Sequence, residues 1–500
     1  MEPIFGLPLQ IPPRSSRGRL RALHGQLRTA ILEGRLQPGL RLPPTRALAQ
    51  ACEVSRNTVM AAYDLLLSEG YLVARQGSGT YVANVLPDLS DRARMTSATR
   101  MRSAQVESDS RLCAFWRRAA SEIDIANEAA RERPRFDFRL GVPDLSRFPM
   151  EVWRRLSARA LRAFGRTSRF HWQPHGLPVL REAIAKYVSF ARAVSCRPDD
   201  VTVTAGAQQA FDLLARILVT PGRTVVAVEN PGYRPARAAF AAAGAKIIPV
   251  PVDAEGLVVA RLPRATKVVC VTPSHQFPLG VVMSASRRAA LLEFAHARGA
   301  VVIEDDYDAE FRFGGRPLDA LQTLDRSESV FYVGTFSKSL FPAIRLGFAV
   351  APAWAHRALG AIKLFTDWQC APVAQDALAA FINEGYLAHH VRRMRRIYGV
   401  RRELLLDGLH KELGAWLEPV PALAGLHVAA LSTTPLSMPA LVERARQQDV
   451  GLYSLDRFGS GRSVRPGLVF GYGSVDEPGI QAGLARLRRI CAQMDGAPAA

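Results

Sequence analysis

The segment GTFSKSLFPAIRLGF, residues 334–348, is the most informative one for the fold of the larger part of this 500-residue chain. It leaves one short apolar run at residue 334 and enters the next at residue 346. Both belong to a series of β-branched runs that alternate with helical patterns, at residues 201–204, 225–228, 246–250, 267–272, 300–304, 330–334 and 346–350. Near-continuous apolar strands between helices are typical of parallel sheets with both faces covered. The pattern therefore predicts an α/β fold with a mainly parallel, seven-stranded sheet.

Polar or small residues directly follow several of these runs, and ligands of such sheets bind at the carboxyl ends of the strands. Gly206 and Ala207 open a helical segment, whose free amides and dipole could hold a phosphate. Asp305 follows the run 300–304, where its carboxylate could face a cationic ring nitrogen. Each signal alone is weak, because Asp305 could equally cap a helix.

Lys338 is a more specific signal. It stands in SKS after an apolar run, with Arg345 seven residues later, in a chain with only six lysines beside 59 arginines. An amine that attacks an aldehyde must be unprotonated and desolvated, which the end of an apolar strand near an arginine and a phosphate can provide. An isolated lysine is usually a solvated surface amine, but this combination predicts a nucleophilic Lys338.

Together these segments resemble the fold type I, aspartate-aminotransferase-like family of pyridoxal-phosphate proteins over about residues 136–495. The resemblance implies that pyridoxal 5'-phosphate is the cofactor and that Lys338 binds it covalently. It also implies that Asp305 pairs with the pyridine nitrogen and that Tyr307 contacts the ring oxygen. Also implied are phosphate contacts from Gly206, Ala207, Thr335, Ser337 and Arg345, ring stacking by Tyr233, and Gln276 at the position where the enzymes usually carry asparagine.

One departure from that family concerns the substrate carboxylate. Leu468 in GLVFGYG stands where the enzymes carry the arginine that binds this carboxylate. Arg465, close to that position, and Arg237, in ENPGYRPAR, are the candidates to bind an effector carboxylate instead. The resemblance therefore implies cofactor binding, whereas ordinary amino-acid substrates are in doubt.

The N-terminal part, residues 14–83, has a different pattern. Leucines and an isoleucine recur on one helical face up to residue 31, which predicts a first helix that ends near Gly34. Thr45 and Ser55 are the expected N-caps of a second helix, residues 46–51, and of a third helix. Two β-prone runs flank the glycines of residues 76–79, which predicts a hairpin. Helix-turn-helix followed by a hairpin is the order of a winged helix.

This segment resembles the GntR-type winged helix over about 65 residues, including VSRNTVMAAYDLLLSEGY and GSGTYV. Nine arginines and two acids lie between residues 14 and 56, and the formal net charge of the chain is +20. This excess favours a polyanionic partner, although an arginine-rich coding bias would produce it as well. The resemblance implies double-stranded DNA contacts from Arg46, Ser55, Arg56, Asn57, Thr58 and Gly77.

Residues 84–135 are polar and rich in arginine, serine and alanine, as is typical of a linker. The joined architecture resembles the MocR/GabR group of bacterial transcription regulators. It implies a homodimeric regulator that binds promoter DNA, carries the cofactor on Lys338 and responds to an amine, an amino acid or pyridoxal phosphate itself. Two rivals stay open: an active aminotransferase with a fused DNA-binding domain, and a large domain that serves only for dimerisation.

Composition excludes several other classes. The six cysteines are scattered without a CxxC pair, so we expect neither a disulfide framework nor a metal site. No run approaches 18 apolar residues, and the N-terminus lacks a secretion signal. We therefore expect a cytoplasmic protein with no membrane partner.

Overall fold

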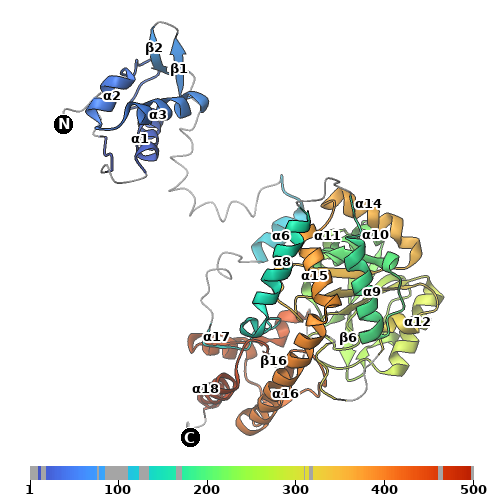
Figure 1. The fold of residues 1–500 in the computed structure, drawn as a ribbon. Coiled ribbons are helices and arrows are strands. Elements are labelled where there is room, and N and C mark those ends of the chain that lie inside the picture. Colours follow the sequence, from blue (N-terminus) through green and yellow to red (C-terminus); the bar gives the residue numbers. More distant parts are fainter. Residues whose placement is uncertain are drawn as a thin grey trace. The chain divides into compact units, whose positions relative to one another are not determined.

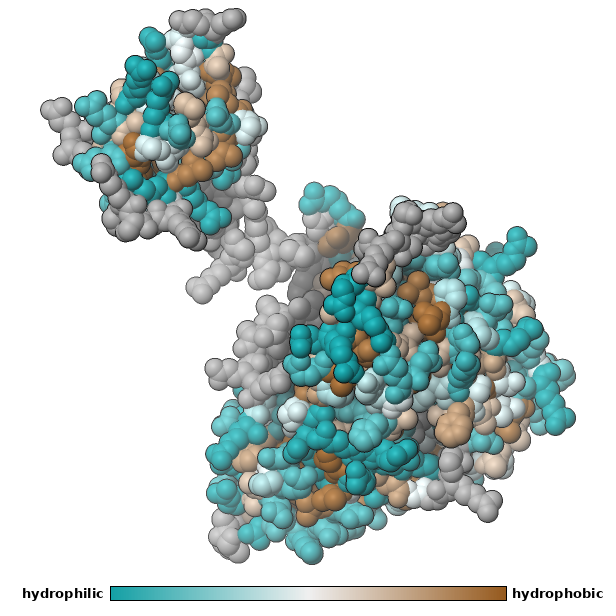
Figure 2. All heavy atoms as spheres, viewed as in Figure 1, coloured by the Kyte–Doolittle hydropathy of each residue, from teal (hydrophilic) through white to brown (hydrophobic). Residues whose placement is uncertain are grey.

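The computed structural model describes residues 9–12, 18–75, 78–84, 111–122, 134–164, 172–308, 310–314, 319–459 and 465–496. The chain forms two compact units, Met1–Asp124 and Ile125–Ala500 (Figure 1). Hydrophilic residues are spread over both units in the view of Figure 2, with small hydrophobic patches between them. The domain bounds 14–83, 84–135 and 136–495 stay predictions.

The first unit contains the predicted helix-turn-helix and hairpin. Its helices are α1 (Arg19–Leu32), α2 (Thr45–Ala51) and α3 (Arg56–Ser68), and a further helix, α6 (Ala114–Glu122), lies near its end. Strands β1 (Leu72–Arg75) and β2 (Gly79–Val82) pair in antiparallel fashion. The apolar faces of α1 and α3 pack together as the periodicity predicts, through the buried residues Leu23, Leu27, Ile31, Val59, Ala62, Tyr63 and Leu66.

The two expected N-caps have different outcomes. The Ser55 hydroxyl accepts a hydrogen bond from the Thr58 amide at 3.1 Å, so Ser55 caps α3 as expected. The expectation for Thr45 is wrong, because Thr45 is already the first helical residue and Pro44 is the N-cap. The ring of Pro44 restricts φ (−56°), and its ψ of 144° makes it the extended residue before the helix, which therefore begins at Thr45, one residue earlier than expected.

One mixed sheet, mainly parallel, forms the centre of the second unit. Its strand order is β4-β11-β10-β9-β8-β5-β6-β7, and all seven predicted strands belong to it. Only β11 and β7 run antiparallel to their neighbours, and the two-residue edge strand β7 is one that the sequence did not predict. The strands are β4 (Val201–Thr204), β5 (Val225–Asn230), β6 (Lys246–Asp253), β7 (Gly256–Leu257), β8 (Thr266–Val271), β9 (Val301–Asp306), β10 (Val330–Thr335) and β11 (Gly347–Val350).

Helices cover both faces of this sheet, as expected for near-continuous apolar strands. Successive residues of one strand face opposite sides: in β10, Phe331 packs in one cluster and Tyr332 in another. One face carries α10 (Ala207–Leu218), α11 (Arg234–Ala242) and α14 (His356–Thr366). The other carries α8 (Met150–Phe164), α9 (Pro178–Arg192), α12 (Ala285–Arg298), α13 (Leu321–Leu324) and α15 (Pro372–Asn383).

A second, antiparallel sheet lies in the C-terminal part, with strand order β12-β13-β16-β15. No pattern in the sequence predicted it. Its strands are β12 (Leu417–Pro419), β13 (His427–Ser432), β15 (Tyr453–Ser454) and β16 (Gly467–Gly471), and β3 (Phe136–Asp137) pairs separately with β14 (Val450–Gly451). The helices here are α16 (Tyr386–Leu413), α17 (Met438–Gln447) and α18 (Glu477–Asp495). Among the helices of the described ranges, none is both long enough and apolar enough to cross a bilayer.

Candidate functional site

The strand register brings three of the predicted polar segments to one edge of the large sheet. Asp305 of β9 lies opposite Val333 of β10, and Thr335 at the end of β10 lies opposite Gly347 of β11. Gly347 in turn lies opposite Thr204, where β4 ends and the segment with Gly206 begins. Residues far apart in sequence therefore meet at the carboxyl ends of the parallel strands, as the sheet topology predicts.

A cradle for an anion forms at the first turn of α10. Gly206 has a positive φ of 79°, and a Cβ placed there would lie 3.0 Å from Nη2 of Arg345. That guanidinium donates a hydrogen bond to the Ala205 carbonyl at 2.7 Å. A Cβ on Gly347 would lie 3.0 Å from the Ala207 amide nitrogen, so this helix start also approaches β11 closely.

Two hydroxyl groups lie beside this cradle. The Thr335 hydroxyl donates to the Ser337 hydroxyl at 3.1 Å and accepts from the Ser337 amide at 3.2 Å. A guanidinium, hydroxyl groups and the amides of a helix start are the groups that bind phosphate in proteins. The structure thus brings together the five predicted phosphate contacts, Gly206, Ala207, Thr335, Ser337 and Arg345.

Lys338 follows β10, and its amine points into the protein. Its Nζ donates a hydrogen bond to the Gly141 carbonyl at 2.9 Å. Desolvation lowers the pKa of this amine, and the nearby carboxylates of Asp308 and Asp305 oppose the shift. Gly141, at φ +81°, was missed by the sequence reasoning; its glycine identity is the available signal, because a Cβ there would lie 2.5 Å from Nζ.

Asp305 is a buried acid with a hydrogen-bond acceptor that the described residues leave unsatisfied. It is 8% exposed, and among the described residues its Oδ1 has no hydrogen-bond partner. Burial, together with Asp306, Asp308 and Glu229, holds its pKa well above the usual range, and Lys338 opposes the shift. A cationic N–H group beside Oδ1 would favour the ionised form.

The expected ring contacts differ in their surroundings. The Tyr307 hydroxyl lies 2.9 Å from His275 Nδ1 and donates to the His275 carbonyl at 3.0 Å. The Gln276 amide donates to the carbonyls of Pro231 and Phe277, at 2.9 and 2.7 Å, and its oxygen accepts from the Leu279 amide at 3.1 Å. The same amide nitrogen lies 3.3 Å from Glu229 Oε2, so Gln276 is held by backbone groups and by Glu229, and its contact with a ring stays a prediction.

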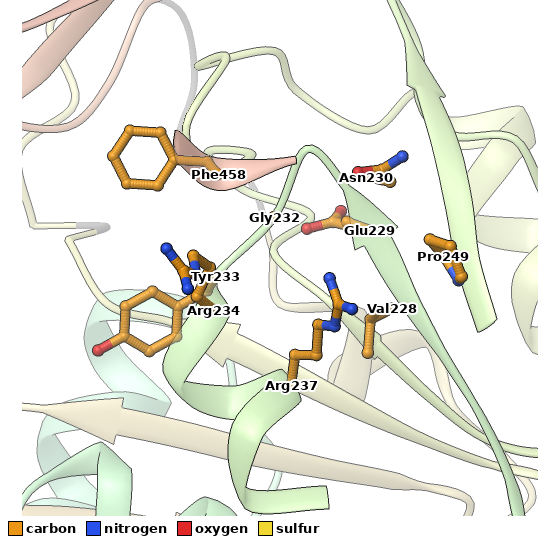
Figure 3. Close-up of a pocket in the computed structure, with 9 residues that line it drawn as sticks. All are labelled: Val228, Glu229, Asn230, Gly232, Tyr233, Arg234, Arg237, Pro249 and Phe458. Carbon is orange, nitrogen blue, oxygen red and sulfur yellow. The ribbon is translucent and has the colours of Figure 1, made fainter. Parts of the chain in front are cut away.

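Tyr233 stands between two cavities that share Val228, Glu229, Tyr233 and Arg237. One, whose space of about 320 Å³ includes open solvent, reaches from Tyr233 to Asp305. The other, whose space of about 250 Å³ also includes open solvent, is lined in addition by Arg234 and Phe458. Figure 3 shows the Arg237 side chain extending from α11 toward Glu229. The Tyr233 ring packs edge-on against Phe277 at 5.4 Å, and burial raises the pKa of its hydroxyl to about 12.

Glu229, at the end of β5, was also missed by the sequence reasoning. Its Oε2 accepts hydrogen bonds from the Thr272 hydroxyl at 2.6 Å and from the Thr272 amide at 3.2 Å, whereas Oε1 has no partner among the described residues. Burial raises the pKa of Glu229 to about 7. The available signal is its position, because an acid at the end of a strand buried on both faces is unusual.

The two candidate arginines for an effector carboxylate lie in different surroundings. Arg237 lines both cavities. Arg465 is exposed just before β16 and is not among the residues that line them. Leu468, where the enzymes carry an arginine, is fully buried in the core between the second sheet and its helices.

The predicted DNA contacts lie at the start of α3 and on α2. Ser55, Arg56 and Asn57 are exposed there, and Arg46 is exposed on α2. Thr58 is half-buried, and Arg56 Nε donates to the Thr45 hydroxyl at 3.4 Å. Gly77 lies outside the described residues. Donors and acceptors at the start of a recognition helix suit phosphates and base edges.

Two family models each match one part of the chain, and known regulators match nearly all of it. The family model "Bacterial regulatory proteins, gntR family" matches residues 21–82, and "Aminotransferase class I and II" matches residues 137–456. The chain is 38% identical over 475 residues to the "Probable rhizopine catabolism regulatory protein MocR" of Rhizobium meliloti, covering 94% of this chain and 92% of that protein. It is 34% identical over 463 residues to the regulator TauR of Rhodobacter capsulatus, covering 92% and 93%.

Two solved aminotransferase structures are similar to this chain. The kynurenine aminotransferase of Pyrococcus horikoshii has a TM-score of 0.68 at 27% identity, covering 74% of this chain and 93% of its own. LysN of Thermus thermophilus, an α-aminoadipate aminotransferase solved with N-(5'-phosphopyridoxyl)-L-leucine, has a TM-score of 0.66 at 29% identity, covering 72% and 93%.

Proposed function

The chain belongs to the MocR family of HTH-type transcriptional regulators, and we propose that its winged helix binds promoter DNA while Lys338 holds pyridoxal 5'-phosphate as the sensor of a small molecule. One observation carries the proposal: a buried Asp305 oxygen, which has no hydrogen-bond partner among the described residues, lies near an amine of lowered pKa, that of Lys338. A pyridine N–H would give Asp305 its missing donor, and an aldehyde would suit the amine of Lys338.

Each nearby group has a task in this proposal. The amide of Ala207 and the guanidinium of Arg345 would bind the phosphate, and Tyr233 would cover one face of the ring. When bound, pyridoxal 5'-phosphate supplies an aldehyde that primary amines capture reversibly. The phosphopyridoxyl ligand of the similar LysN structure supports the same choice of cofactor.

We propose a small amine or amino acid as the effector. It would compete with Lys338 for the aldehyde, and the displaced lysine amine has an acceptor at hand in the Gly141 carbonyl. Arg237, at the cavities, is placed better than Arg465 to bind an effector carboxylate. An effector shifts a conformational equilibrium only if it binds two arrangements with different affinities. Pyridoxal phosphate as the signal itself is the alternative, and DNA affinity measured with loaded and empty protein separates the two.

The rival function, a working aminotransferase, requires a group that orients the substrate carboxylate. The fully buried leucine at position 468 disfavours it. Incubating the purified protein with amino donors and a 2-oxoacid tests the rival. Many turnovers at rates typical of enzymes, about 1 s⁻¹ or more, would establish catalysis and contradict the regulator-only proposal.

Reduction with borohydride tests the cofactor site directly. We expect the treated, cofactor-loaded chain to yield a pyridoxyl adduct on the peptide that contains Lys338, and a Lys338→Ala chain to yield none. An adduct confined to other lysines would contradict the proposal. We also propose a homodimer, which sedimentation of the full chain at micromolar concentration tests; a monomer alone would contradict it.

A further inference from the structure

A buried cluster adjoins the cofactor site and has no role in the function proposed so far. We call it the His275 cluster, formed by His275, Tyr307, Asp308 and His427. His275, Asp308 and His427 are 2%, 2% and 3% exposed. They come from three segments: the loop after β8, the segment after β9, and the first residue of β13 in the second sheet. The cluster therefore joins the cofactor edge of the large sheet to the C-terminal sheet.

The partners of His275 indicate where its proton lies. Its Nδ1 is 3.1 Å from both carboxylate oxygens of Asp308, which can only accept when ionised. Nδ1 therefore carries a proton in this arrangement. The Tyr307 hydroxyl oxygen is 2.9 Å from the same nitrogen, and its own proton is directed to the His275 carbonyl at 3.0 Å. Side chain and backbone of one residue thus hold the Tyr307 hydroxyl from two sides.

Close packing fixes the His275 ring. A Cβ on Gly425 would lie 1.9 Å from His275 Cε1 and 2.6 Å from an Asp308 oxygen, and Gly425 has φ +86°. A Cβ on Gly280 would lie 3.2 Å from His275 Nε2, which is buried and has no partner among the described residues. Because backbone fills both sides, the ring has little room to rotate away from Tyr307.

The remaining groups around the ring do not compete for Nδ1. His427 donates from Nε2 to the Pro278 carbonyl at 3.0 Å, and its ring centre lies 4.6 Å from that of His275. Burial, with His275 and Lys338 nearby, lowers the pKa of His427 well below its usual value, so this ring is neutral at pH 7. Burial, with Asp308 and Asp305 nearby, raises the pKa of Tyr307 well above its usual value, so its hydroxyl keeps its proton.

We propose that His275, held by Asp308, is a positioning residue that orients the Tyr307 hydroxyl toward the ring oxygen of the bound cofactor. This inference rests on the proposed function. The single Nδ1 proton of His275 is shared between Asp308 and the Tyr307 oxygen, and in the cofactor-free chain the Tyr307 proton is donated to the His275 carbonyl. When the ring oxygen of the cofactor replaces that carbonyl as the acceptor, the shared N–H polarises the O–H bond of Tyr307 and makes the hydroxyl a stronger donor. A stronger donor stabilises a negative ring oxygen, and with it the unprotonated form of the link between Lys338 and the cofactor.

The test is a pH titration of the absorbance of the cofactor-loaded, full-length chain. His275→Leu removes the donor, His275→Asn keeps an N–H close to the Nδ1 position, and Tyr307→Phe sets the largest change to be expected. His410→Leu, at an exposed position of α16, is the control. In His275→Leu we expect the titration midpoint to rise by about half a pH unit or more, a change of roughly threefold in the equilibrium constant. In His275→Asn we expect more than half of this rise to be abolished.

Three results would overturn the inference: a midpoint in His275→Leu equal to that of the wild type while Tyr307→Phe shifts it, no rescue by asparagine, or a stoichiometric divalent metal in the purified protein. The last would replace the Nδ1 proton, and ligand atoms of His275, Asp308 and His427 do lie within 4.8 Å of one another. If His275→Leu does not fold, Asp308→Asn provides the same titration, and an unchanged midpoint there also overturns it.

Failure of the proposed function gives a different signature. A wild-type chain without cofactor absorbance and without an adduct at Lys338 would refute the cofactor, not the hydrogen bonds. The ¹⁵N-histidine spectrum of the cofactor-free chain then tests the cluster. We expect one histidine with its proton on Nδ1, whose signal disappears in His275→Asn and moves in Tyr307→Phe; a proton on Nε2 of His275 would overturn the assignment.

Discussion

Replacing Asp305 with asparagine should have opposite effects on the empty and the loaded protein. In the cofactor-free chain, Asp305 is a buried carboxyl beside three other acids, and one of its oxygens has no partner among the described residues. A buried polar group without a partner costs about 1–3 kcal/mol, and more when it is charged. Asparagine keeps the shape and cannot become charged, so we expect the larger unit of the empty chain to gain about 1 kcal/mol, or roughly 1–2 °C in Tm for a unit of this size.

In the cofactor-loaded protein, Asp305→Asn should be unfavourable instead of stabilising. The hydrogen bond between an ionised Asp305 and the pyridine N–H contributes about 1.5–3 kcal/mol. Without it the affinity for pyridoxal 5'-phosphate should fall about 10- to 100-fold. Thermal unfolding of empty and saturated protein, with a fluorescence titration for Kd, measures both effects. An empty Asp305→Asn chain less stable than the wild type, or a Kd within twofold of it, would refute the reasoning.

The neighbouring residue on the same strand is the matched control. Asp306 is equally buried, but it accepts from Arg192 at 2.6 Å and from the Tyr332 hydroxyl at 2.7 Å. Asp306→Asn leaves a buried guanidinium without its counter-charge, so we expect it to destabilise the empty chain by about 3–5 kcal/mol. A gain in stability on substitution at position 305 and a loss at position 306 would distinguish an acid that lacks a partner until a ligand binds from one whose partners belong to the fold.

The remaining predictions concern the anion cradle, the buried acid at the cavities and the DNA contacts. Gly206→Ala should weaken cofactor binding at least about fivefold, because alanine at this backbone conformation is strained by about 1–3 kcal/mol and its Cβ contacts Arg345. Gly222→Ala, also at positive φ but in open space, is the control. Equal cofactor affinities of the two variants would contradict the argument. Burial raises the pKa of Glu229 to about 7, so its contribution to the stability of the empty chain is present at low pH and is lost as pH rises from about 4.5 through 7. Glu229→Gln should therefore flatten this part of the curve of unfolding free energy against pH. Arg56→Ala should weaken promoter binding about tenfold in a gel-shift or anisotropy assay and leave cofactor absorbance unchanged; unaltered DNA affinity would exclude Arg56 as a contact.

Apolar patterning was enough to predict the winged helix and the seven main strands, because strands buried on both faces and helices with one buried face leave periodic signals. It placed Asp305, Thr335 and Lys338 at one edge, since parallel strands end together. It missed the second sheet, whose strands are two to six residues long and separated by loops. It also missed Gly141 and Glu229, because a glycine or a strand-end acid is only a weak local signal and the roles of both residues depend on contacts with residues distant in sequence.

Several groups at the site are held in charge states that a ligand would change. The pKa of Lys338 is lowered by burial, those of Asp305 and Glu229 are raised, and the latter two each have an oxygen without a partner among the described residues. Such an arrangement lowers the stability of the cofactor-free chain. A ligand that supplies a donor to Asp305 and reacts with Lys338 removes this cost, which adds to its binding free energy. The same reasoning limits the effector, because its own interactions must compensate for the loss of the link between Lys338 and the cofactor. An effector that only filled the cavity near Arg237 would leave the Lys338 link intact, and we would then expect no change in cofactor absorbance when it binds.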